Sequence, residues 1–271
     1  MPVGIITGSG GHSLPGLVVG QTLDAQTPFG TVEVSRGELA GVEVLHLSRH
    51  GPGHVRLSHQ VGHRANIWAL RELGATAVLA ATVCGAVEPA LELGSLIVFD
   101  DLHFPSNRLA DGSLCTFFVE PADPRRGHLV LHGGPFSDGV RAAMLAAARD
   151  AVAPGSLSPR DGGAYAHVDG PRFNTPSEIA ALAACGVVAV SQTAGPEAVL
   201  CGELELAYGL VGFVTDYANG VRPGRPTPVA VLTEMIAASG AALAAVLARA
   251  AARLAADPPI ASGTMLRLGP G

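Results

Sequence analysis

Apolar segments that end in small polar residues recur along this chain, and two of them lie close together in its last third. They are Val187–Ser191, which leads into Gln192 and Thr193, and Tyr208–Thr215, which leads into Asp216 and Asn219. Short apolar runs bounded by polar residues are typical of strands buried inside a sheet. Because ligands bind at the carboxyl ends of strands in α/β sheets, we expect both polar groups at one rim.

The other apolar segments alternate with helical patterns. Strands are expected at Val3–Thr7, Thr31–Arg36, Val42–Leu47, Thr76–Ala81, Ser95–Phe99 and Ala164–Val168, with helices at Leu57–Leu73, Ser137–Val152, Thr175 to just before Gly186, and Pro228–Ala256. Ser137 and Thr175 are expected to cap their helices, and the last helix to break or bend near Gly240 and to cover one face of the sheet. The alternation predicts an α/β fold, in which residues 1–271 form a single domain with a central mixed β-sheet flanked by helices. Residues 104–136 are irregular, as in a lid or a subunit contact.

The composition excludes several classes of function. All 17 basic residues are arginine, which rules out a lysine Schiff base and a Walker phosphate loop. The net charge is −6 without a basic run, so we expect no nucleic-acid partner. We find no apolar run of transmembrane length and no signal peptide, and therefore expect no membrane association and a cytoplasmic location. The four cysteines lack metal-ligand spacing and are expected to be buried thiols.

Four separate strand ends supply groups that suit an oxyanion. They are Ser9, Arg49 with His50, Thr82 with Val83, and Thr193. Hydroxyls, backbone amides and a guanidinium that can bind two oxygens at once favour phosphate. Arg49 has a structural alternative as an ion-pair partner, and Ser9 and Thr193 as turn residues.

Metal sites are not expected from this sequence. Five of the ten histidines lie between His46 and His63, but no carboxylate or cysteine lies in that stretch to complete a metal site. Asp100 and Asp101 fit an exposed loop better than a cation site.

A second group of residues suits a flat heterocycle. Phe173 supplies an aromatic face, while Asp216 and Asn219 supply hydrogen-bonding groups at the end of a strand. No recognisable nucleophile–base set accompanies them. A reaction whose nucleophile is the bound anion would need none.

Six segments together resemble a known enzyme family. They are GIITGSG at 4–10, SRHGPGH at 48–54, RANIWALRELGA at 64–75, DGPRFNTPSE at 169–178, TAGPEAVL at 193–200 and VTDYANG at 214–220. The chain resembles the trimeric purine nucleoside phosphorylases, most closely their 5′-methylthioadenosine phosphorylase branch. The resemblance implies the nucleoside phosphorylase fold, phosphate-driven cleavage of a purine nucleoside, no cofactor beyond inorganic phosphate as co-substrate, and a homotrimer or dimer of trimers.

The resemblance also implies roles for individual residues. Ser9, Arg49, His50, Thr82, the Val83 amide and Thr193 would hold phosphate. Cys84, Gly85, Phe173, Gln192, Ala218 and Asn219 would surround the nucleoside, with Phe173 on the base and Gln192 under the ribose. Asp216 would face purine N7 as the catalytic acid. Glu197 would either hold ribose hydroxyls or cap its helix, and His128 or His132 would either reach a neighbour's active site or be an ordinary loop histidine.

Three departures from the family pattern affect the nucleoside half of the site. The second acid of the usual Asp-x-Asp is Ala218, the methionine usual under the ribose is Gln192, and Gly62-His63 replaces the usual Asn-Tyr. The GG of the first loop is Thr7-Gly8. Asn219 is expected either to replace the missing acid or to meet a 6-oxo group, and Gln192 to contact an additional polar group of the substrate. We therefore expect phosphorolysis with an altered nucleoside preference. A 6-aminopurine nucleoside with a 5′-thioether ranks first, then 6-oxopurine analogues, a specialised biosynthetic nucleoside, and a non-catalytic nucleoside-binding role.

Overall fold

The computed structural model of this chain describes residues 2–9, 13–121, 123–153, 155–224 and 226–267. Its strands are β1 (Val3–Thr7), β2 (Val18–Thr27), β3 (Gly30–Leu39), β4 (Val42–Ser48), β5 (Ala77–Ala86), β6 (Leu96–Val98), β7 (Asp101–His103), β8 (His128–Val130), β9 (Arg160–Asp161), β10 (Ala164–His167), β11 (Val187–Ser191), β12 (Ala207–Tyr217) and β13 (Thr264–Leu266). Its α-helices are α1 (His63–Glu72), α2 (Asp138–Ala151), α3 (Pro176–Ala184), α4 (Ala194–Glu203) and α5 (Val229–Ala256), and two short 3₁₀ turns cover Pro52–His54 and Ser58–Gln60.

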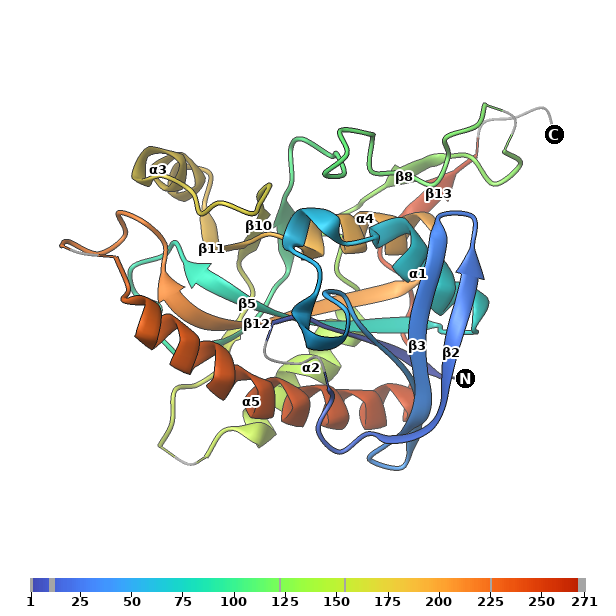
Figure 1. Cartoon of the computed structure of the whole chain (residues 1–271), viewed down its shortest axis with the longest axis horizontal. Helices are drawn as coiled ribbons and strands as arrows, with labels where there is room; N and C mark the ends of the chain where they lie inside the picture. The colour runs from blue at the N-terminus through green and yellow to red at the C-terminus, as the bar shows by residue number, and fades with distance from the viewer. Residues whose placement is uncertain (1, 10–12, 122, 154, 225, 268–271) are drawn as a thin grey trace.

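A mixed sheet of eleven strands forms the centre of the molecule, as the sequence predicted. Its main path runs β2-β3-β4-β1-β5-β11-β10-β7. In addition, β12 pairs with β5 and β6, and β6 pairs with β9. Strands β1, β4 and β12 run parallel to β5, whereas β11 is antiparallel to it. A separate pair, β8 with β13, lies apart from this sheet (Figure 1).

Helices cover both faces of the sheet (Figure 1). α2 and α5 pack against each other and against β12 on one face, while α1 and α4 lie on the other. Each face has its own apolar core. One core includes Leu70, Leu200 and Leu210, and the other includes Val211 and Leu247, all fully buried. The expectation that the last helix covers one face is confirmed.

Strand β5 changes partners along its length, and this change opens the sheet. Residues 77–80 pair with β1, and residues 85–86 pair with β11 on the same edge. Between them, residues 81–84 pair with β12 on the other edge and, among the described strands, with neither β1 nor β11. Thr82, Val83 and Cys84 therefore sit at a gap in the sheet, where backbone and side-chain groups can face a ligand.

Several sequence predictions of local structure need correction. The expected helix Leu57–Leu73 begins only at His63. Residues 58–60 form a separate 3₁₀ turn instead, in which the Leu57 backbone N–H donates to Oε1 of Gln60. Ser137 starts α2 without capping it, since its hydroxyl donates to the Ile260 carbonyl over 2.6 Å. Helix α5 runs unbroken through Gly240. By contrast, the Thr175–Glu178 capping box of α3 is confirmed.

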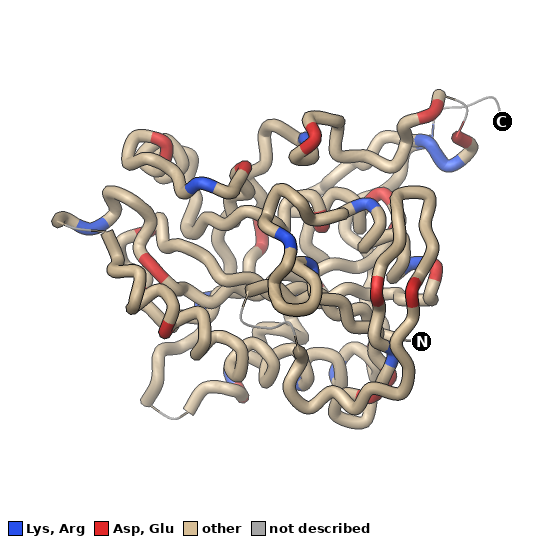
Figure 2. The backbone as a smooth tube through the Cα atoms, viewed as in Figure 1, with Lys and Arg blue, Asp and Glu red and all other residues tan. Residues whose placement is uncertain are grey.

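Two further expectations also differ from the structure. Helix α5 is long and apolar enough to span a membrane by length and composition, although its second half packs in the core through Leu243, Val246 and Leu247. Cys185 is exposed at the end of α3, unlike the three buried thiols. By contrast, arginines are spread among acidic residues over the described part of the chain, as Figure 2 shows, in agreement with the expected lack of a basic run.

Candidate active site

A cavity of about 280 Å³ lies over the gap in the sheet. Many of the site residues predicted from the sequence line this cavity. They are Ser9, Arg49, His50, Thr82, Val83, Cys84, Gly85, Phe173, Gln192, Thr193, Asp216, Ala218 and Asn219. They come from the ends of β1, β4, β5, β11 and β12 and from the loop before α3. The structure thus brings every one of these residues to one place. His128 is exposed in β8, outside the cavity lining, so its contribution to a neighbouring subunit stays a prediction.

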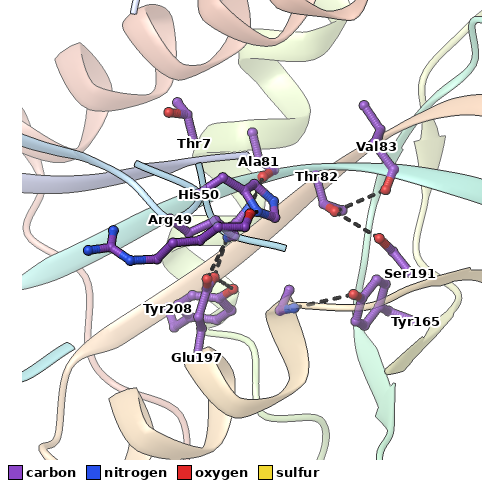
Figure 3. Close-up of polar contacts among 12 residues, drawn as sticks. Thr7, Arg49, His50, Ala81, Thr82, Val83, Tyr165, Ser191, Glu197 and Tyr208 are labelled. Carbon is purple, nitrogen blue, oxygen red and sulfur yellow. Dashed lines mark hydrogen bonds and ion pairs between the residues drawn. The ribbon is translucent and has the colours of Figure 1, made fainter. Parts of the chain in front are cut away.

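Hydroxyl groups gather at one end of the cavity. The Thr82 hydroxyl donates to the Val83 carbonyl over 3.0 Å and lies 3.3 Å from the Ser191 hydroxyl (Figure 3). Thr193 is buried at the first residue before α4, and its side chain does not cap that helix. The positive end of the helix dipole therefore points toward this end of the cavity.

Arg49 lies at the same end in a buried ion pair (Figure 3). Its Nε donates to Oε1 of Glu197 over 2.7 Å, and its Nη2 donates to Oε2 over 3.0 Å. Its Nη1 donates to the Ala81 carbonyl over 2.7 Å. Glu197 is fully buried outside the cavity lining, and its two carboxylate oxygens accept from Arg49 and Tyr208. The alternative of a structural ion pair for Arg49 is thus observed, in a residue that also lines the cavity.

His50 is a neutral histidine in this setting. Burial, with the nearby Arg49 cation as a second cause, lowers the pKa of His50 to about 4. Its Nδ1 lies 2.9 Å from the Arg56 carbonyl, which can only accept, so Nδ1 carries the proton. The remaining Nε2 is then an acceptor. In the neutral ring this atom suits the hydroxyl of a protonated phosphate rather than a bare oxygen.

The opposite end of the cavity is built around Asp216. Its Oδ1 accepts from the Thr215 hydroxyl over 2.9 Å, and a side chain at Gly85 would come within 3.1 Å of Oδ2. Burial raises the pKa of the Asp216 carboxyl, and the Thr215 hydrogen bond opposes part of that rise. Glycine at 85 therefore leaves room beside Oδ2, where a protonated carboxyl can meet a ligand.

The neighbours of Asp216 fit a planar ligand. Ala218 is buried and offers no polar group. The Asn219 Nδ2 donates to the Asn174 carbonyl over 2.7 Å, which leaves its Oδ1 as an acceptor. Phe173 lines the cavity with 61% of its surface exposed, so its ring is free to stack on a planar ligand.

Several lining residues were not predicted from the sequence. Ser58 donates to Oε1 of Gln192, and Leu232 and Ile236 face the cavity from the first turns of α5. The i, i+4 spacing of Leu232 and Ile236 marks one helix face, but nothing in the sequence says that this face meets a ligand. Ser58 was expected inside a helix, and no motif of the sequence marked it as a site residue.

Metal ligands do not gather in the described part of the chain. No group of three or more histidine, cysteine, aspartate or glutamate side chains there could hold an ion. His46 lies instead with its Nε2 2.8 Å from the Thr7 hydroxyl, and His50 stacks on His54 with ring centroids 4.2 Å apart. The chemistry available is anion binding beside a protonatable carboxyl.

Comparison with known proteins agrees with this fold. The Phosphorylase superfamily pattern matches residues 2–253. A probable 6-oxopurine nucleoside phosphorylase of Thermococcus kodakarensis is 35% identical over 237 residues, covering 86% of this chain and 85% of its own. A probable S-methyl-5′-thioinosine phosphorylase of Pseudomonas syringae is 38% identical over 221 residues, covering 80% and 85%. The crystal structure of a methylthioadenosine phosphorylase from Schistosoma mansoni, bound to adenine, superposes with a TM-score of 0.83 at 28% identity, covering 95% and 93%.

The cavity at the gap in this α/β sheet holds anion-binding groups and a protonatable carboxyl. This combination is typical of a group-transfer enzyme. The chain belongs to the Phosphorylase superfamily. It is a pentosyltransferase, as its named relatives are.

Proposed function

We propose that this enzyme cleaves a purine nucleoside with inorganic phosphate, and that its first substrate is 5′-methylthioadenosine or a related 5′-modified 6-aminopurine nucleoside. A phosphate oxygen bonds to C1′ of the ribose as the C1′–N9 bond breaks, and the bonding electron pair leaves with the base. The products are the free base and a ribose 1-phosphate that keeps the 5′ substituent.

The observation that carries this proposal is the environment of Asp216. Its carboxyl is largely buried, which raises its pKa, and its Oδ2 lies over Gly85 in the cavity. The leaving base gains negative charge, so a proton that Asp216 supplies to N7 lowers the barrier. A carboxylic acid suits this task better than an amide, because it can transfer the proton.

The phosphate end supports the same reaction. Thr82 and Thr193 supply hydroxyls, Val83 supplies an amide at the gap in β5, and Arg49 lines the cavity beside them. Together they suit an anion placed next to the sugar. The charge of the bound phosphate would stabilise the positive charge that develops on the ribose as the base leaves.

Features of the nucleoside end favour a 6-amino group and an apolar 5′ substituent. Oδ1 of Asn219 is an acceptor, and an exocyclic amino group is a donor. Leu232 and Ile236 of α5 give the cavity an apolar wall, which suits a thioether. We also propose that the protein assembles as a homotrimer.

A second candidate is phosphorolysis of 6-oxopurine nucleosides such as methylthioinosine or inosine. The specific observation in its favour is Ala218, which offers no acceptor for a 6-amino group. Relatives named for 6-oxopurine nucleosides and for methylthioinosine match at similar identity. A specialised biosynthetic nucleoside would use the same site.

One assay separates these candidates. The protein is incubated with methylthioadenosine, adenosine, methylthioinosine and inosine, each with and without phosphate, and the free base is measured. We expect phosphate-dependent release, fastest from methylthioadenosine. Faster release from the 6-oxo nucleosides would support the second candidate. Binding without release from any of them would point to a non-catalytic role and contradict the proposal.

A further inference from the structure

The buried ion pair of Arg49 and Glu197 includes a third residue, Tyr208. The Tyr208 hydroxyl donates to Oε2 of Glu197 over 3.0 Å, so that this oxygen accepts from both Tyr208 and Arg49 (Figure 3). Glu197 comes from α4 and Tyr208 from β12, while Arg49 follows β4. The exposed fractions of Arg49, Glu197 and Tyr208 are 1%, 0% and 1%. Two consecutive elements, α4 and β12, therefore fix a guanidinium that lies 148 positions before Glu197.

The hydrogen bonds define which part of the guanidinium is left for a ligand. An arginine side chain has five N–H bonds in one plane. Glu197 takes the Nε bond and one on Nη2, and the Ala81 carbonyl takes one on Nη1. Among the described residues no further acceptor bonds to Arg49, which leaves two N–H bonds, one on each terminal nitrogen. Because Arg49 lines the cavity, these two bonds are the ones that a phosphate there can use.

Packing allows the guanidinium little freedom. A side chain at Gly8 would overlap Nη1 of Arg49, so the end of β1 closes on the guanidinium directly. Ala81 and Glu197 hold two other sides of the same plane. An arginine on an exposed loop must lose side-chain freedom when it binds an anion. Here that freedom is already lost before phosphate arrives.

The charge of Arg49 is also balanced before phosphate arrives. Its single positive charge faces the single negative charge of Glu197 at 2.7 Å. His50, the other basic side chain beside Arg49, is neutral at pH 7 because burial lowers its pKa to about 4. Arg49 thus offers phosphate a fixed direction for two hydrogen bonds rather than an uncompensated charge.

We infer that Glu197, held by Tyr208, is a positioning residue for phosphate in this enzyme. Glu197 holds Arg49 with its two remaining N–H bonds toward the phosphate end of the cavity. This inference rests on the proposed phosphorolysis, and it adds two residues that touch neither phosphate nor nucleoside. A purely structural pair would stabilise the fold and leave phosphate affinity unchanged.

Glu197→Gln tests this role with little change in volume. The amide supplies one acceptor instead of two and places an NH₂ group against an arginine N–H, so the guanidinium must turn. Calorimetric titration with inorganic phosphate alone should show about 10-fold weaker binding, and kcat/KM for phosphate should fall by a similar factor. The KM for the nucleoside should change by less than about 2-fold, because the base end is untouched.

Tyr208→Phe and Glu88→Gln complete the experiment. Tyr208→Phe keeps the ion pair and removes one of its hydrogen bonds, and it should weaken phosphate binding about 3-fold. If Glu197→Gln fails to fold, this variant decides alone. Glu88→Gln is the matched control, because Glu88 lies 2.8 Å from Arg160 in another glutamate–arginine pair, outside the cavity lining. It should bind phosphate as the wild type does.

The outcomes separate this inference from the proposed function. If the wild type binds no phosphate, both fail. If folded Glu197→Gln and Tyr208→Phe bind phosphate like the wild type, the pair is structural only and this inference alone is overturned. Tighter phosphate binding by Glu197→Gln would also overturn it, because unmasking the charge of Arg49 would then matter more than its direction.

Discussion

The Ser58 hydroxyl donates to Oε1 of Gln192 over 2.8 Å, although the two residues lie 134 positions apart. Nε2 of Gln192 donates in turn to the Arg172 carbonyl over 3.0 Å. Gly170 lies against both groups, and a side chain there would overlap the Ser58 hydroxyl and Oε1 of Gln192. The Gln192 amide thus joins the loop after β4 to the loop before α3. Both of its polar ends contact the protein, so the expectation that it contacts a polar group of the substrate finds no support in this geometry.

Ser58→Ala should loosen the two loops around the nucleoside. Because the lost hydrogen bond is worth about 1 kcal/mol, kcat/KM for the nucleoside should fall about 5-fold, mainly through KM. Phosphate affinity should stay unchanged. Ser113→Ala is the control, since it removes a serine hydrogen bond to Asp111 in an exposed loop outside the cavity lining. Equal kinetics for the two variants would show that the Ser58–Gln192 contact has no part in nucleoside binding.

Asn219→Ala should reduce the preference for 6-aminopurine nucleosides. The variant removes the Oδ1 acceptor and the link to the Asn174 carbonyl. We expect the ratio of kcat/KM for methylthioadenosine to that for methylthioinosine to fall about 10-fold, which corresponds to ~1.4 kcal/mol. Steady-state kinetics on both nucleosides give the ratio directly. An unchanged ratio would mean that Asn219 does not contact the 6-position.

Four buried histidines should make the fold sensitive to acid. Burial lowers the pKa of His46 and His50 to about 4 and of His63 and His167 to about 3. The unfolded chain, with ordinary histidine pKa values near 6.5, binds more protons between these limits. Stability is therefore fully present above pH 6.5 and is lost as the pH falls toward 4, by up to about 1.4 kcal/mol per histidine per pH unit.

Urea unfolding at pH 7.5 and pH 5.0 measures this loss. His63→Gln removes one of the four groups and should make the difference between the two pH values smaller by about 2 kcal/mol. A wild type equally stable at both pH values would show that these histidines titrate normally in the folded protein.

Asp216→Asn should stabilise the protein while it harms the reaction. Burial raises the pKa of Asp216 in the folded protein above its value of about 4 in the unfolded chain. The folded protein therefore holds this proton more tightly than the unfolded chain, and its stability falls as the pH rises from about 4 through the raised pKa. Asparagine keeps the acceptor for the Thr215 hydroxyl and removes the buried charge. We expect a melting temperature about 2–4 °C higher at pH 8 and little difference at pH 4. A lower melting temperature at pH 8 would contradict the raised pKa.

The sequence predicted those features that depend on local patterns. Buried runs such as Val187–Ser191 became strands with the expected bounds, and the Thr175–Glu178 spacing gave the capping box of α3. Strand β2 was missed because its residues are mostly exposed and carry no apolar signal. The helical periodicity from Leu57 was misleading, because the Gln60 side chain caps a separate turn there.

The site residues could be gathered from the sequence, but not their partners. Motif positions and strand ends placed Arg49 and Asp216 in one pocket, as the cavity lining agrees. The Arg49–Glu197 pair joins residues 148 positions apart, and the Ser58–Gln192 pair is equally remote. Such contacts depend on how the sheet brings separate loops together. No spacing within the sequence encodes them.

In the proposed reaction, Asp216 protonates the leaving base. This role is tested most directly by the kcat of Asp216→Asn for phosphorolysis of methylthioadenosine at saturating phosphate. Because an amide cannot transfer the proton, we expect kcat to fall by about 100-fold or more, with phosphate affinity unchanged. Full activity of the folded variant on methylthioadenosine would contradict the acid role of Asp216.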